Sequence, residues 1–145
     1  MNLLDRLGRE RLFFDGGTGT LLQAQGLRGG ELPETWNLLH PERITALHRA
    51  YLEAGADIVC TNTFGANALK FPDGGDCDLE ALVRAGVEHA CTARREAGRE
   101  GDAFVALDIG PSGKLLKPMG DLDFEDAVAL FARVVRAGAS AGADL

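Results

Sequence analysis

The sequence predicts an α/β fold in which parallel strands alternate with helices, and three observations lead to this prediction. Short apolar segments start near residues 12, 57, 103 and 144, at intervals of 41 to 46 residues. Their apolar residues are continuous rather than alternating, as expected for strands buried on both faces. Segments of helical periodicity fill the intervals, and strand–helix alternation of this kind gives right-handed crossovers and a parallel sheet.

The predicted strands are residues 12–14, 57–61, 103–107 and the beginning of a fourth at 144–145. The first three run directly into polar, glycine-bearing sequences. A short repeat supports this layout, because residues 54–58 (AGADI) recur as residues 141–145 (AGADL). In both copies a helix ends, a glycine can adopt the left-handed conformation, and a strand begins.

Three helices are predicted between these strands. Pro41 and Glu42 suit the first turn of the first helix, and Asp78 and Asp123 are candidate N-caps of the second and third. The second helix should end near Gly98. The residues expected to face inward are Ile44, Leu47, Tyr51 and Leu52, then Leu79, Leu82, Val83, Val87 and Ala90, then Phe124, Ala127, Val128, Phe131, Val134 and Val135.

The repeat count suggests an incomplete barrel. Three βα units and the first two residues of a fourth strand fit in 145 residues, whereas a closed parallel barrel needs eight units and about 250 residues. We therefore expect residues 1–145 to be the N-terminal part, roughly the first half, of a parallel (βα)8 TIM-type barrel, truncated at the start of strand 4. A small open α/β sheet, complete in itself, is the alternative.

Composition narrows the function classes. The formal net charge is −7 and no basic stripe is present, which argues against nucleic-acid and anionic-membrane partners. The N-terminus lacks the apolar core of a signal peptide, and no apolar run approaches the roughly 20 residues of a membrane span. Three cysteines without CxxC spacing indicate a reducing compartment. We expect a cytoplasmic enzyme.

The longest loops follow the strand ends, at residues 16–40, 62–77 and 110–121, which places the functional face at Asp15, Asn62 and Asp108. In residues 15–20 (DGGTGT), glycine N–H groups could meet a ligand while Asp15 holds an ammonium group; a turn capped by Asp15 is the alternative. Residues 61–67 (TNTFGAN) could bind a polar substrate or simply form a turn and cap. Residues 108–114 (DIGPSGK) form a rigid turn.

Histidine and cysteine show no metal signature. His40, His48 and His89 are isolated, and we expect structural or surface roles for them. Cys60 and Cys91 should pack as small hydrophobic residues, and Cys77, in an acidic loop, is a poor candidate for a nucleophile. We expect no catalytic residue and no metal ligand in this chain.

Taken in order, several strings resemble the homocysteine S-methyltransferase family. They are residues 14–20 (FDGGTGT), 32–34 (LPE) with Asn37, 41–42 (PE), 54–57 (AGAD), 61–66 (TNTFGA) and 108–113 (DIGPSG). The resemblance covers nearly the whole chain. Gly65 and the 110–113 loop resemble the cobalamin-dependent methionine synthase branch more than the betaine-using branch, which tends to place a bulky aromatic residue at the Gly65 position.

The resemblance implies a (βα)8 barrel of about twice this length that binds homocysteine at the strand ends. It also implies a zinc ion held by three cysteines, which turns the bound thiol into the thiolate that attacks a methyl donor. Asp15 matches the acidic residue near the ammonium group. Gly16, Gly17, Asn62 and Thr63 match residues of the same pocket, and we add Asp108 from its strand-end position.

The resemblance places the zinc cysteines beyond Leu145, so we expect this chain to be inactive alone and to need the remaining half of the barrel or further domains. Cobalamin and methyltetrahydrofolate are expected if it belongs to a full-length methionine synthase. One alternative is a homocysteine methyltransferase that uses S-methylmethionine or is fused to a folate-reductase domain. Another is a non-catalytic half-barrel that assembles with a partner chain.

Overall fold

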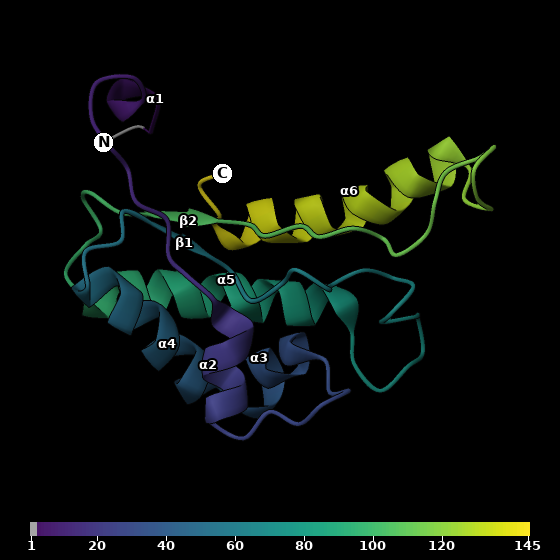
Figure 1. Cartoon of the computed structure of the whole chain (residues 1–145), viewed down its shortest axis with the longest axis horizontal. Helices are drawn as coiled ribbons and strands as arrows, with labels where there is room; N and C mark the ends of the chain where they lie inside the picture. Colours follow the sequence, from purple (N-terminus) through teal and green to yellow (C-terminus); the bar gives the residue numbers. More distant parts are fainter. Residues whose placement is uncertain (1–2) are drawn as a thin grey trace.

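The computed structural model describes residues 3–145, and Figure 1 shows how the elements are arranged. The elements follow in the order α1 (Leu3–Arg6), α2 (Thr18–Ala24), η1 (Pro33–Thr35), α3 (Trp36–Leu39), α4 (Pro41–Glu53), β1 (Ile58–Cys60), α5 (Leu79–Glu96), β2 (Phe104–Ala106) and α6 (Phe124–Ala141). Strand and helix therefore alternate from α4 onward, as the periodicity predicts. No helix within residues 3–145 is long and apolar enough to cross a membrane.

The strands are parallel, and their neighbours follow the order of the chain. β1 pairs with β2 in the register Ile58 with Phe104. Phe14 forms a parallel bridge to Ile58 on the other edge of β1. On the other edge of β2, the Asp144 N–H donates to the Val105 carbonyl (2.9 Å). Four adjacent segments are thus present, which is consistent with part of a parallel barrel.

The first predicted strand is reduced to a single bridge. The reason lies in Asp57, whose Oδ2 accepts the Phe13 N–H at 2.9 Å, so a side chain rather than the ladder satisfies that donor. The fourth segment repeats this arrangement, because Asp144 Oδ2 accepts the Val105 N–H at 2.8 Å. The aspartates of the two AGAD copies therefore fasten each strand start to the preceding segment.

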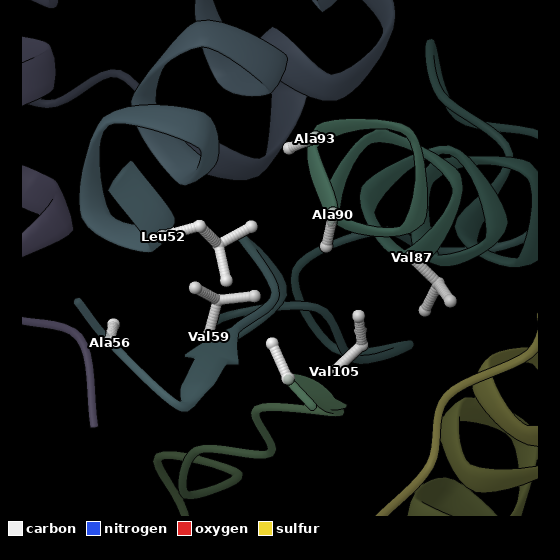
Figure 2. Packing of buried hydrophobic residues seen from close by; sticks show 8 residues of the cluster. Leu52, Ala56, Val59, Val87, Ala90, Ala93 and Val105 are labelled. Atoms are coloured by element: carbon white, nitrogen blue, oxygen red, sulfur yellow. The ribbon is translucent and has the colours of Figure 1, made fainter. Parts of the chain in front are cut away.

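The main core lies between the sheet and the helices α4 and α5. Val59 of β1 and Val105 of β2 point toward Leu52 of α4 and toward Val87 and Ala90 of α5 (Figure 2). The opposite face of the strands carries Ile58, Phe104 and Ala106, which form a separate cluster. Side chains alternate along a strand, so consecutive residues serve the two faces. Burial on both faces explains the continuous apolar runs in the sequence.

Two of the three predicted helices match the structure closely. α4 begins at Pro41, and α5 follows Asp78, whose Oδ1 accepts the Ala81 N–H at 2.7 Å. Every residue predicted for the inner face of α5 is buried. Gly98, just beyond α5, has a φ of 67°. The predicted glycine turns are also present, because Gly55 and Gly142 have φ values of 102° and 100°.

The inward face predicted for α6 is partly wrong. Ala127 and Val134 are buried, but Phe124, Val128 and Val135 are 66%, 47% and 46% exposed. α6 packs on α5 and its buried face is formed mainly by small residues, which include Ala137 and Gly138. The predicted inward face of α6 was too wide, because within the described chain α6 has a packing partner on one side only.

The long first loop is also more ordered than predicted. Residues 16–40, expected as a loop, contain α2, η1 and α3. These are short elements, and the seven-residue α2 buries only Leu22. Too few apolar positions repeat in such segments for periodicity to reveal them.

Candidate functional site

The three polar strand ends meet around one cavity of about 460 Å³. Asp15, Gly16, Asn62 and Asp108, all predicted for the substrate pocket, line it. Asp15 follows the Phe14 bridge, Asn62 lies just beyond β1, and Asp108 lies just beyond β2. Adjacent parallel strands bring their carboxyl ends to one edge, which explains the convergence. The placement is the one predicted, whereas substrate binding by these residues stays a prediction.

Gly17 and Thr63, the other two predicted pocket residues, do not line this cavity. Thr63 is fully buried, and its hydroxyl donates to the Asp108 carbonyl at 2.8 Å. The Gly17 carbonyl accepts a hydrogen bond from the Tyr51 hydroxyl at 3.2 Å. Both residues therefore hold the surrounding chain, and Thr63 shapes the backbone on which Asp108 is carried.

Asp15 joins two strand ends. Its N–H donates to the Ile58 carbonyl at 2.9 Å, and its Oδ2 accepts the Cys60 N–H at 2.9 Å. This is the capping role that the sequence left open, but the donor is on the next strand rather than in the local turn. Burial raises the pKa of Asp15, the Cys60 N–H opposes that change, and the Asp108 charge adds to it.

Asp108 reaches the cavity from a firmly held backbone. Its N–H donates to the Thr61 hydroxyl at 3.1 Å, and the Thr61 and Thr63 hydroxyl oxygens lie 2.6 Å apart. Burial raises the pKa of Asp108, and the charge of Glu34 raises it further. Half-buried carboxylates whose pKa is raised by a neighbouring carboxylate are stabilised by a cationic ligand.

Asn62 is held by an asparagine that the sequence analysis did not place in the site. Asn62 Nδ2 donates to Asn37 Oδ1 (2.9 Å) and to the Pro33 carbonyl (2.8 Å). Asn37, only 1% exposed, donates in turn to the backbone carbonyls of Asn62 and Leu82. Because both acceptors require the amide NH2, the Asn62 orientation is determined. The side-chain oxygen of Asn62, Oδ1, makes no hydrogen bond within residues 3–145.

Glu34 and Lys70 also line the cavity, and the sequence analysis proposed neither. Glu34 is 4% exposed, and its Oε1 accepts the Gly65 N–H at 2.5 Å. Its second oxygen, Oε2, is buried without a hydrogen-bond partner in the described chain. An acidic residue directly after Pro33 equally suits a helix start, so only the fold shows the contact with Gly65.

The cysteine in the cavity wall is not poised for metal binding. Burial, followed by the charge of Asp15, raises the pKa of Cys60 to about 12, so its sulfur stays protonated at neutral pH. Within residues 3–145, no three His, Cys, Asp or Glu side chains are grouped closely enough to hold a metal ion. Cys77 and Cys91 are free and lie outside this cavity.

A larger cavity of about 550 Å³ lies beside α3 and is lined by Trp36, His40 and Arg43 among others. None of the predicted site residues lines it. The Arg43 guanidinium stacks over the Trp36 ring at 5.2 Å and donates to the Gln25 carbonyl. This cation therefore already has partners within the described chain. We therefore place the site at the strand ends.

Comparison with known proteins gives a family for the chain. The sequence profile of the family described as homocysteine S-methyltransferase matches residues 12–145. The chain is 38% identical over 125 residues to methionine synthase of Mycobacterium tuberculosis, a match covering 79% of the chain and 10% of that protein. It is 37% identical over 124 residues to betaine–homocysteine S-methyltransferase 1 of Xenopus laevis, covering 83% of the chain and 31% of that protein.

Solved structures give the same result. The oxidized form of the homocysteine methyltransferase MmuM from Escherichia coli superimposes with a TM-score of 0.81 and 29% sequence identity. The match covers 99% of this chain and 53% of that one. The chain thus spans about half of this solved relative and a third or less of the two curated relatives.

Proposed function

Because this chain belongs to the homocysteine S-methyltransferase family, we propose that it forms part of the homocysteine pocket of an enzyme that methylates homocysteine to methionine. The observation that supports this most directly is the meeting of Asp15, Asn62 and Asp108 around one cavity. In the complete protein, the N-terminal half of a (βα)8 barrel would supply these residues. The other half of the barrel would supply the opposite wall.

The geometry suits the ammonium end of an amino acid. Asp15 and Asp108 present two carboxylates, and Asn62 presents an amide oxygen that has no donor within the described chain. An ammonium group has three N–H donors and no acceptor, so it matches oxygen acceptors of this kind. Both carboxylates are half-buried, which strengthens the attraction because they are screened less than fully exposed groups.

Methylation requires the homocysteine thiol to lose its proton, after which the sulfur forms a bond to the methyl carbon while the donor–methyl bond breaks. A free thiol with a pKa near 8.5 is only a few per cent ionised at pH 7. Zinc would supply this ionisation when bound, but among the described residues the cavity offers one cysteine, Cys60, and no group of three ligating side chains, so it does not fit zinc. These residues therefore bind and orient the substrate.

We assign the methyl donor to the cobalamin branch, with methyltetrahydrofolate as the source of the methyl group. The support comes from Gly65. A β-carbon at this position would lie 2.6 Å from Glu34 Oε1 and 2.9 Å from Lys70 Nζ, so a bulky aromatic residue would have to displace the ends of both side chains. The identities to methionine synthase and to the betaine-dependent enzyme are nearly equal and do not separate the two branches.

The pocket assignment is tested by titrating the chain with homocysteine and following amide chemical shifts by NMR. Asp15→Asn keeps an oxygen that can accept the Cys60 N–H but removes the charge, so we expect about tenfold weaker binding. Asp123→Asn, an exposed carboxylate on the α6 side, is the matched control and should leave binding unchanged. Equal affinity for Asp15→Asn and wild type, or no binding at all, would contradict the assignment.

A turnover assay tests the second part of the proposal. The 145-residue chain, supplied with homocysteine, zinc and a methyl donor, should release no methionine, because the described residues offer no group of ligands for the metal. Zinc-dependent formation of methionine by this chain alone would contradict the prediction that the chain is inactive, and it would leave the pocket assignment unchanged.

A further inference from the structure

Among the residues that the structure describes, Lys70 is the one cation in the wall of the strand-end cavity. The other ionisable groups there are the carboxylates of Asp15, Glu34 and Asp108 and the thiol of Cys60. Lys70 makes no ion pair or hydrogen bond through its ammonium group to any of residues 3–145, although three carboxylates share its cavity. An unpaired cation remains available to an anionic ligand group.

The Lys70 ammonium lies beside Gly65 at the wall of the cavity. A β-carbon built on Gly65 would lie 2.9 Å from Lys70 Nζ, so the side chain folds back over Gly65 toward the cavity. The backbone below it is anchored, because the Lys70 N–H donates to Asn67 Oδ1 (3.2 Å) and the next side chain, Phe71, is buried. Glu34 Oε1 lies over the same face of Gly65 and favours a cation there.

The charged groups of the cavity lie in two places, with the Lys70 ammonium and Glu34 both beside Gly65. Asp15 and Asp108 are carried on the strand ends, whereas Lys70 belongs to the loop that follows Gly65. An α-amino acid carries an ammonium and a carboxylate on one carbon atom. With the ammonium on the strand-end carboxylates, its own carboxylate is attracted to a cation in the same cavity, and within the described wall only Lys70 provides one.

We propose that Lys70 contacts the α-carboxylate of the substrate and makes this pocket select an amino acid over the corresponding amine. The inference rests on the proposed function, in which the ligand is homocysteine. It adds a residue that determines specificity. It also gives Gly65 a role, since the absent side chain leaves the space in which the lysine ammonium lies.

The experiment compares two thiols in NMR titrations of the whole chain. Homocysteine carries the carboxylate, and 3-aminopropane-1-thiol is the same molecule without it. We expect Lys70→Met to weaken homocysteine binding about fivefold and to leave binding of the amine unchanged or slightly stronger. Lys70→Arg should retain most of the affinity. Lys114→Met, which removes an exposed lysine outside the cavity, is the matched control and should alter neither titration.

The outcomes separate the two proposals. If wild type binds homocysteine and Lys70→Met binds it equally well, or loses affinity for both thiols to the same extent, the role of Lys70 is refuted and the homocysteine pocket stands. If wild type binds neither thiol, the proposed function itself fails. Lys70 is exposed, so its variants should keep the wild-type circular dichroism spectrum and melting temperature, and a shift in either would assign the lysine a structural role instead.

Discussion

The asparagine pair shows how one buried residue sets the chemistry of another. Asn37 is almost fully buried and uses its amide NH2 on the carbonyls of Asn62 and Leu82. Its oxygen is then free to accept from Asn62, whose own oxygen is left for a ligand. Sequence reasoning found Asn62 because it follows a strand. It gave Asn37 no role in the site, because the two residues are 25 positions apart and meet only after folding.

His48 is a residue whose environment predicts a pH dependence of stability. It is fully buried on α4, and neither ring nitrogen has a hydrogen-bond partner in the described chain. Burial, and secondarily the charge of His89, lowers its pKa from 6.5 to about 4. Between these values the unfolded chain binds more protons than the folded chain. The free energy of unfolding is therefore not reduced by His48 above pH 6.5, and it decreases as the pH falls from 6.5 toward 4.

We expect His48 to account for a loss of about 3 kcal/mol of unfolding free energy between pH 7 and pH 4. Leucine has a similar volume and no polar atoms, so His48→Leu should be neutral or stabilising at pH 7 and should lose less stability on acidification. Urea unfolding of both proteins at several pH values measures this. Parallel pH profiles for the two proteins would show that His48 is not responsible.

At the scale of helices, the two acidic N-caps predicted from sequence behave differently. Asp78 accepts the Ala81 N–H and so caps α5. Asp123 precedes α6 in the same way, but its carboxylate makes no cap and pairs with Lys117 at 2.9 Å. Residue type marked both helix starts correctly. The side-chain rotamer, which depends on nearby charges, decided which aspartate satisfies a backbone donor.

We expect Asp78→Ala to destabilise the chain by about 1 kcal/mol, since a helix loses its side-chain cap. Asp123→Ala removes only an exposed ion pair and should cost roughly 0.5 kcal/mol or less. Thermal or urea unfolding of the two variants gives the comparison. A larger loss for Asp123→Ala than for Asp78→Ala would contradict the assigned roles.

Gly86 links α5 to the site through close packing. A β-carbon there would lie 2.7 Å from Asn37 Nδ2 and 2.9 Å from Thr63 Cγ2, both of which belong to the buried polar network behind the cavity. Alanine is favoured over glycine within a helix by about 1 kcal/mol. The network leaves little room for movement, so the steric cost should exceed that gain.

We predict that Gly86→Ala destabilises the chain by about 1 kcal/mol in net terms. Gly19→Ala is the matched control, because Gly19 is helical, exposed and has no atom within 4 Å of its would-be β-carbon. That variant should be neutral or stabilised by up to about 1 kcal/mol. Equal stabilisation of both variants in urea unfolding would show that Asn37 and Thr63 can move to accommodate a β-carbon at position 86.

At the scale of the whole molecule, apolar groups stay exposed beside the sheet. Phe13 and Phe14, on the outer edge of β1, are 61% and 57% exposed, and Phe124 of α6 is 66% exposed. Large exposed aromatic residues beside an unpaired strand edge favour association with another chain. In a complete barrel, later strands and helices would cover these positions. They also support the alternative of a half-barrel that assembles with a partner.

We expect the 145-residue chain to self-associate at concentrations of about 10–100 µM, as species with exposed apolar surface and strand edges do. Phe13→Ser should weaken this association, because Phe13 is exposed and lies at the edge. Lys114→Met, a surface change outside the cavity and the strand edge, serves as the control. Sedimentation velocity over a concentration series measures the effect, and a strictly monomeric wild type would contradict the prediction.

The sequence by itself determined the order of strands and helices from α4 onward, the residues at which these helices start and the glycine turns of the AGAD repeats. It also determined that Asp15, Asn62 and Asp108 share one edge. These features follow from local patterns and from the parallel geometry that strand–helix alternation imposes. Only the tertiary structure decided that Glu34 and Lys70 join the cavity and that Thr63 stands behind it. Their positions depend on contacts between loops far apart in the chain, and no local periodicity encodes those contacts.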